Sequence, residues 1–108
     1  MKTTEIIFKV TVDENNLPHT ITWTSPETGD GNECKSMMVA LWDGKDNSTM
    51  RIDLWTKDMM IDEMKKFYHQ NVFTLTDTYM RATGDNATGE RIKALLTEIG
   101  KENGILKK

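Results

Sequence analysis

The chain has 108 residues, which is enough for one hydrophobic core and too few for two independent ones. Its 37% hydrophobic and 29% charged residues exclude both a disordered polar chain and an apolar membrane protein. The net charge is -3 and no block of basic residues occurs, so nucleic acid is not an expected partner, because a phosphate backbone requires a positively charged surface.

The sequence also bears on where the protein acts. No segment approaches the roughly 18 consecutive apolar residues of a membrane-spanning helix, and the N-terminal residues lack the apolar run of a signal peptide. The single cysteine, Cys34, has no partner for an intramolecular disulfide, as is usual in a reducing compartment. We therefore expect a cytoplasmic protein without direct membrane insertion.

The first half of the chain begins with two segments that alternate between apolar and polar residues. Residues 5–12 and 19–24 both show this period of two, which is typical of half-buried strands, and the polar residues 13–16 between them form a turn. The two strands are predicted to pair as a hairpin. Residues 26–32, which are rich in glycine and polar side chains, are predicted to be a loop.

Residues 33–42 are ambiguous, because their apolar positions fit a helical stripe as well as a strand. The compact polar turn at 43–48 and the clearly alternating residues 50–55 behind it favour a strand. With this interpretation, the first half of the chain contains four antiparallel strands.

The apolar period changes at residue 60 to steps of three and four, which predicts a helix over residues 60–83. Asp58 is the expected N-cap residue, and Gly84 ends the helix. A second helix is predicted over residues 88–103. The expected architecture is a single α+β domain over residues 1–108, with a four-stranded antiparallel sheet followed by two α-helices packed on one face of it.

Few residues are candidates for catalysis or metal binding. The chain has two histidines, His19 and His69, and their spacing is not that of a metal-ligand pair, so we interpret both as surface residues. Nothing near Cys34 in the sequence indicates a lowered pKa, and residues 84–91 have glutamate and arginine where a phosphate-binding loop needs lysine and a hydroxyl. We therefore predict no catalytic residue, no metal and no cofactor, and we keep an enzyme with an unrecognised site only as a third alternative.

The more informative feature is that the third and fourth predicted strands carry bulky residues on both faces. Two helices cover only one face of a sheet, so the other face is predicted to bind a partner or a second copy, unless the loop at 26–32 folds over it. The exposed face contains two tryptophans and continues into the start of the long helix. The candidate interaction surface comprises Met38, Trp42, Trp55, Lys57, Met59 and Met60.

The run RIDLWTKDM at residues 51–59, continued by DEMK at 62–65 and FYHQ at 67–70, resembles the GldC family of gliding motility proteins from Bacteroidetes-type bacteria. The resemblance covers roughly residues 5–83. It implies a non-enzymatic accessory protein of the gliding machinery that acts by protein contact with envelope-anchored gliding components. A homo-oligomer, either a dimer or a tetramer, is expected.

The predicted order of four strands and two helices is also similar to the export chaperone SecB. This second likeness is one of topology and carries no shared motif. It implies an alternative function, a SecB-like holdase for unfolded or exported clients, in which the many methionines and the exposed tryptophans would form an adaptable surface.

Overall fold

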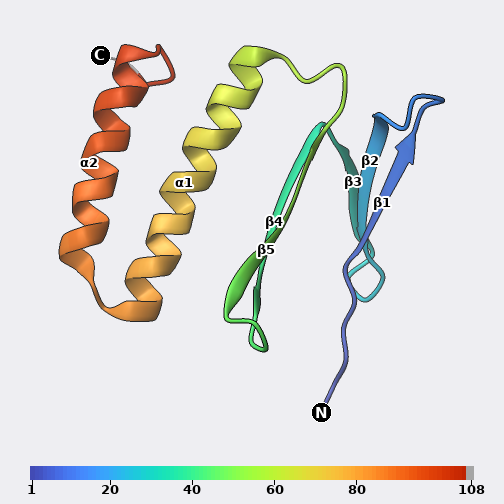
Figure 1. Cartoon of the computed structure of the whole chain (residues 1–108), viewed down its shortest axis with the longest axis horizontal. Helices are drawn as coiled ribbons and strands as arrows, with labels where there is room; N and C mark the ends of the chain where they lie inside the picture. Colours follow the sequence, from blue (N-terminus) through green and yellow to red (C-terminus); the bar gives the residue numbers. More distant parts are fainter. Residues whose placement is uncertain (107–108) are drawn as a thin grey trace. The chain divides into compact units, whose positions relative to one another are not determined.

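The computed structural model describes residues 1–106 and divides the chain into two compact units, Met1–Met59 and the residues from Met60 onward. The first unit contains five antiparallel strands and the second contains two helices (Figure 1). The α+β class with antiparallel strands and two C-terminal helices is therefore confirmed. The packing of the helices on a sheet face stays a prediction.

The first sheet has the strand order β1-β2-β3, with β1 at Ile7–Val12, β2 at Pro18–Ser25 and β3 at Asp30–Cys34. Most of its apolar side chains share one face, since Phe8 lies opposite Trp23 and Val10 lies opposite Ile21. The threonines of β2 occupy the other face, as the alternation predicts. Ile21 is fully buried and lies at the centre of this sheet, between β1 and β3.

The second sheet is a hairpin of β4, Ser36–Asp43, and β5, Ser48–Trp55. The strand interpretation of the ambiguous segment is therefore confirmed. The turn between the strands is held by the Asp43 carboxylate, which accepts a hydrogen bond from the Lys45 N–H at 2.9 Å, and Asn47 adopts the left-handed conformation that asparagine tolerates.

The prediction of one four-stranded sheet is wrong, because the five strands form a three-stranded and a two-stranded sheet. The additional strand is β3, which occupies part of the segment predicted to be a loop. Its sequence, DGNEC, has no apolar alternation, and it becomes a strand only by pairing with β2. Gly31 fits this close pairing, since a Cβ atom there would lie 2.8 Å from the Trp23 carbonyl oxygen.

The second unit is a hairpin of α1, Ile61–Thr83, and α2, Asn86–Glu102. The predicted N-cap of the first helix is wrong: Met60 occupies that position, and its N–H donates to the Glu63 carboxylate at 3.0 Å. The Asp58 carboxylate instead accepts a hydrogen bond from the Thr56 hydroxyl. Gly84 ends α1 in the left-handed conformation, as predicted.

Small and polar residues, together with Leu96, are buried in the two helices. Gly89, Leu96 and Gly100 of α2 are buried, together with His69 and Thr76 of α1. The Nε2 atom of His69 is 2.8 Å from the Leu96 carbonyl oxygen, so the interpretation of His69 as a surface residue is wrong. Within residues 1–106, neither helix has the length and apolar character needed to cross a membrane.

Candidate protein-interaction site

The register of β4 and β5 sorts the side chains of this hairpin onto two faces. Residues directly opposite each other in an antiparallel pair point to the same face. One face is entirely apolar over three successive cross-strand pairs, and we call it the aliphatic face. It comprises Met37 opposite Leu54, Val39 opposite Ile52, and Leu41 opposite Met50.

The opposite face, which we call the Trp face, combines two tryptophans with an ion pair. It consists of four successive cross-strand pairs: Ser36 with Trp55, Met38 with Asp53, Ala40 with Arg51, and Trp42 with Thr49. The division of bulky residues between two faces, as predicted from the sequence, is therefore confirmed by the register.

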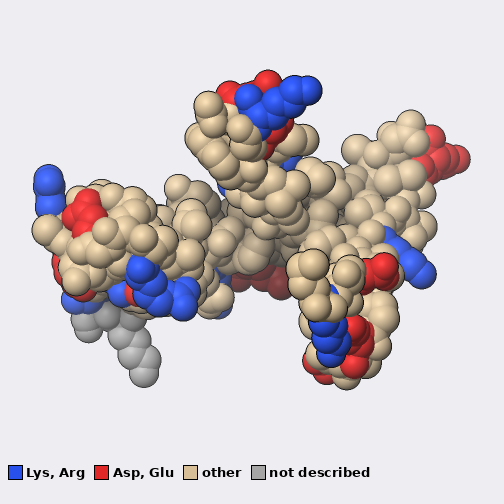
Figure 2. Space-filling model, turned by 90° about the horizontal axis from the view of Figure 1, so that it is seen from below, with Lys and Arg blue, Asp and Glu red and all other residues tan. Residues whose placement is uncertain are grey.

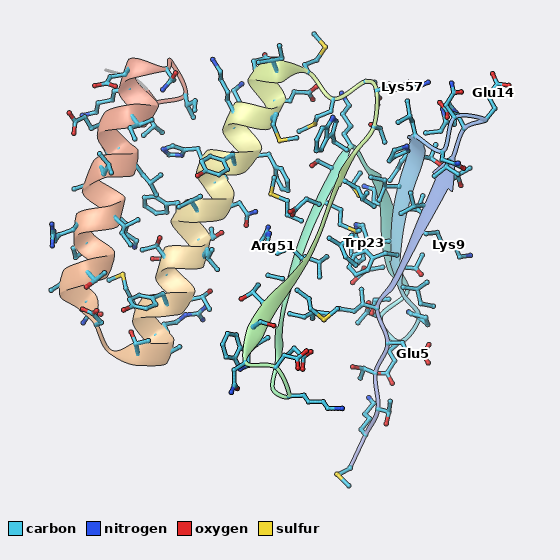
Figure 3. The ribbon with its side chains drawn as sticks, viewed as in Figure 1. Glu5, Lys9, Glu14, Trp23, Arg51 and Lys57 are labelled. Carbon is cyan, nitrogen blue, oxygen red and sulfur yellow. The ribbon has the colours of Figure 1, made fainter. Side chains whose placement is uncertain are left out.

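The Trp face points away from the first sheet. Figure 3 shows the Trp23 side chain between the two sheets and the Arg51 side chain projecting from the other side of the β4–β5 hairpin. Burial varies along both faces: Met37 and Leu54 of the aliphatic face and Met38 of the Trp face are half-buried, whereas Arg51 is exposed. The Trp face is therefore the side of the hairpin that points away from the first sheet.

The two tryptophans lie at opposite ends of the Trp face. Trp42 is paired with Thr49, six residues before Trp55, which corresponds to a separation of about 20 Å along the strands. Trp42 is 67% exposed and Trp55 is 57% exposed. Such large exposed aromatic side chains are typical anchors of protein interfaces.

The centre of the Trp face holds a bidentate ion pair. The Arg51 guanidinium donates two hydrogen bonds to the Asp53 carboxylate, from Nε to Oδ2 at 3.1 Å and from Nη2 to Oδ1 at 2.8 Å. These hydrogen bonds raise the pKa of Arg51 further above its already high ordinary value. The face thus carries one fixed positive and one fixed negative charge between two apolar ends.

A groove of about 270 Å³ adjoins the Trp55 end of the hairpin and lies against the turn between β1 and β2. Leu17 of the turn and Pro18 at the start of β2 form one wall, and the residues from Asp53 to Lys57 form the other. Most of this lining is hydrocarbon, as in many sites that bind an apolar side chain.

An ion pair between Lys57 and Asp13 joins the two walls of the groove, with Nζ 2.5 Å from Oδ2. The hydrogen bond from Lys57, together with those from the backbone N–H groups of Leu17 and Asn15, lowers the pKa of Asp13 to about 2. The Asp13 carboxylate therefore holds the turn and the end of β5 together at neutral pH. Figure 2 shows blue Lys and Arg close to red Asp and Glu side chains at several places on the face in view.

The predicted site residues fall into three places. Met38, Trp42 and Trp55 share the Trp face, and Lys57 lines the groove. Met59 is half-buried in the turn after β5, where its N–H donates to the Thr56 carbonyl oxygen, and Met60 is 61% exposed at the start of α1. The functional assignment of these residues stays a prediction.

Sequence reasoning did not identify Arg51, Asp53, Leu17 and Pro18 as parts of the candidate site. The alternation of β5 contains a signal for the first two, since Arg51 and Asp53 fall on the same face as Trp55. No comparable signal exists for Leu17 and Pro18, because they reach the groove only through the folding of the β1–β2 turn against a segment nearly forty positions later.

A second, polar cavity of about 360 Å³ in the first unit contains Cys34, His19 and Asp58. Burial, and then the charge of Glu33, raises the pKa of the Cys34 thiol, which is the opposite of what a nucleophilic cysteine requires. The hydrogen bond from the Thr56 hydroxyl is the largest influence that lowers the pKa of Asp58. Among the described residues, no group of three or more histidine, cysteine or acidic side chains is placed to hold a metal ion.

Comparison with known families identifies one match. Residues 18–104 match the family described as gliding motility-associated protein GldC-like. This range includes β2 to β5 and both helices, and it contains every residue of the Trp face and every residue that lines the groove except Leu17. Neither the curated proteins nor the solved structures gave a match.

Proposed function

The chain belongs to the GldC-like family of gliding motility-associated proteins, and we propose that it serves the gliding machinery as a non-enzymatic accessory protein that binds other proteins. The family membership carries the link to gliding. The mode of action is our proposal, and it rests on the Trp face of the β4–β5 hairpin.

The observation that supports a binding role most directly is the exposure of both tryptophans on one face. Trp42 and Trp55 are both exposed on one face of a two-stranded hairpin, with the Arg51–Asp53 ion pair between them. Exposed tryptophan and arginine side chains are the residues that most often dominate the binding energy of a protein interface. A two-stranded hairpin is marginally stable alone, so a partner on this face would also stabilise it.

We propose that the groove beside Trp55 accepts an apolar side chain from an envelope-anchored gliding component. Lys57 lies at the edge of the groove and would contact a polar group that flanks this side chain. Met59 lies two residues further along the chain, in the same unit, and would extend the contact. We further propose that the protein does this in the cytoplasm, without a cofactor, metal or nucleic acid.

Affinity purification of the tagged full chain from detergent-solubilised native cells, followed by mass spectrometry, tests the proposal. We expect a small set of gliding or envelope proteins in stoichiometric amounts. The double variant Trp42→Ala plus Trp55→Ala should lose them, because it removes both aromatic anchors of the Trp face.

The matched control is Tyr68→Ala plus Leu75→Ala in α1. Tyr68 is 59% and Leu75 is 61% exposed, so this variant removes apolar side chains of similar exposure from the other unit. The proposal requires that the control retains the partners that the tryptophan variant loses. Retention of the same partners by both variants would place the binding surface elsewhere.

A SecB-like holdase is the second candidate, and the exposed methionine on the aliphatic face favours it. Met50 is 56% exposed and lies opposite Leu41, which is exposed to the same extent. Flexible methionine-rich surfaces suit the binding of varied clients. A holdase would suppress the aggregation of unrelated denatured proteins at near-stoichiometric ratio, whereas the accessory protein that we propose would not.

A further inference from the structure

The register of β4 and β5 shows that the residues of the Trp face are arranged symmetrically about its centre. Its residues on β4 run from Ser36 to Trp42, and those on β5 run from Thr49 to Trp55, so both runs are centred on the Val39–Ile52 pair. We consider a twofold axis that crosses the hairpin at this pair, lies in the plane of the face and runs perpendicular to the strands. It relates the chain to a second copy whose strands run in the opposite direction. It places β4 over β4 of a second copy and β5 over β5.

Under this rotation, each bulky side chain of the Trp face lies opposite a small one, and each charge lies opposite its counterion. The four kinds of contact between the two copies are Trp42 with Ser36, Met38 with Ala40, Trp55 with Thr49, and Arg51 with Asp53. Each contact occurs twice in a dimer. This alternation of large and small side chains is what two packed sheets need in order to interdigitate at a spacing of about 10 Å.

We infer that the Trp face binds the Trp face of a second copy of this chain in a face-to-face, twofold dimer. The inference rests on the proposed function, since it names the protein that this binding face contacts. A twofold interface must be complementary to itself, and the Trp face meets this condition both in size and in charge.

The Arg51–Asp53 ion pair sets the register of the dimer. Each Arg51 already holds the Asp53 of its own chain in a bidentate contact. In the dimer, each Arg51 also faces the Asp53 of the other copy, so that two positive and two negative charges alternate. A shift of one residue pair along the strands would bring like charges together, which disfavours other alignments.

The aliphatic face is not complementary to itself in size and charge. The same rotation places Met37 opposite Leu41 and Leu54 opposite Met50, so only apolar side chains meet and no charge fixes an alignment. Met37 and Leu54 are also half-buried. The self-complementary pattern therefore belongs to the Trp face alone among the two faces of this hairpin.

The exposed area predicts a weak dimer. With Trp42 67% and Trp55 57% exposed, the two tryptophans offer roughly 300 Å² of each chain, taking about 250 Å² for a large aromatic side chain. A standard interface buries about 800 Å² of each partner. The smaller side chains of the face add to the tryptophan area without reaching that size, so we expect dissociation in the micromolar range.

Sedimentation equilibrium of the full chain tests the dimer, with Arg51→Asp and Asp53→Arg as the variants. The wild-type protein should shift from monomer to dimer as its concentration rises to about 100 µM. Each variant should weaken self-association by at least about tenfold, because it places like charges opposite each other twice in the interface.

Sedimentation equilibrium of an equimolar mixture of the two variants is the decisive measurement. One chain then carries two aspartates and the other two arginines at these positions, so the mixed dimer regains both contacts between opposite charges. We expect the mixture to associate at least as strongly as the wild type. Both variants lose the ion pair within the chain, so recovery in the mixture cannot come from restored folding, and circular dichroism of each variant checks that it is folded.

Three results would overturn the inference. They are a wild-type protein that stays monomeric up to about 100 µM, a dimer that neither charge variant weakens, and a mixture that associates no better than the single variants. A monomer that still captures gliding proteins, and loses them in the tryptophan variant, would retain the proposed function and assign the Trp face to another protein. A dimer with no captured partner would retain the inference alone.

Discussion

At the scale of single residues, Asp13 has the most strongly defined role. Its carboxylate accepts hydrogen bonds from Lys57 and from the backbone N–H groups of Leu17 and Asn15, which together lower its pKa to about 2. The ordinary value is 3.8. Asp13 therefore stabilises the folded first unit while it is ionised, and this contribution is complete above pH 3.8 and disappears as the pH falls from 3.8 toward 2.

We expect the Asp13 carboxyl carbon to titrate near pH 2 in an NMR experiment and the Lys57→Met variant to raise this pKa toward 3.8. Lys57 provides the largest contribution to the shift, whereas the two backbone donors remain in the variant. Lys45→Met, which removes an exposed lysine from the β4–β5 turn, serves as the control and should leave the Asp13 titration unchanged. An unchanged Asp13 pKa in Lys57→Met would show that the ion pair does not form in solution.

The same residues show what a sequence can predict at this scale. Trp42 and Trp55 could be assigned to one face, because the compact turn and the alternation together specify which side chains share a side of the hairpin. The Asp13–Lys57 ion pair could not be predicted, since it joins segments that only the tertiary fold brings together. The burial of the His69 side chain could not be predicted for a similar reason, because it depends on Leu96 and Gly100 of the second helix.

At the scale of elements, β3 shows the limit of pattern recognition. The strands with apolar alternation and both helices were predictable, because each buries a regular apolar stripe. Residues 30–34 bury little and contain a glycine, so their composition is that of a loop. They form a strand because the neighbouring edge of β2 offers unpaired backbone groups, a property that the sequence of the segment itself does not contain.

The two glycines of α2 provide a prediction at the element scale. A Cβ atom at Gly100 would lie 2.8 Å from His69 Nε2, whose ring is fixed by its contact with the Leu96 carbonyl oxygen. A Cβ atom at Gly89 would instead meet the Cγ and Sδ atoms of Met80, an unbranched side chain that has to adopt another rotamer to make room. The two glycines should therefore respond differently to the same substitution.

We expect Gly100→Ala to destabilise the protein by about 1–2 kcal/mol in urea unfolding, because overpacking exceeds the helix-propensity gain of about 1 kcal/mol. Gly89→Ala should change the stability by less than about 0.5 kcal/mol, since the same gain offsets the movement of Met80. Equal effects at the two positions would contradict the packing described for His69.

At the scale of the whole molecule, the chain consists of two compact units, one made of strands and one made of helices. The match over residues 18–104 runs through both units, so the family's signature is not confined to the strands or to the helices. The Trp face and the adjoining groove lie in the first unit, where the exposed aromatic side chains and the fixed charges are found together. We propose that this unit carries the protein-binding surface.

Site-specific photo-crosslinking in living cells tests this central claim most directly. A photoreactive residue at Thr49 would lie on the exposed Trp face beside Trp42, and one at Lys9 would lie on the polar, exposed face of the first sheet. We predict adducts from position 49 with a second copy of the chain or with a gliding protein, and none from position 9. No adduct from position 49, or the same adducts from both positions, would contradict a binding role for the Trp face.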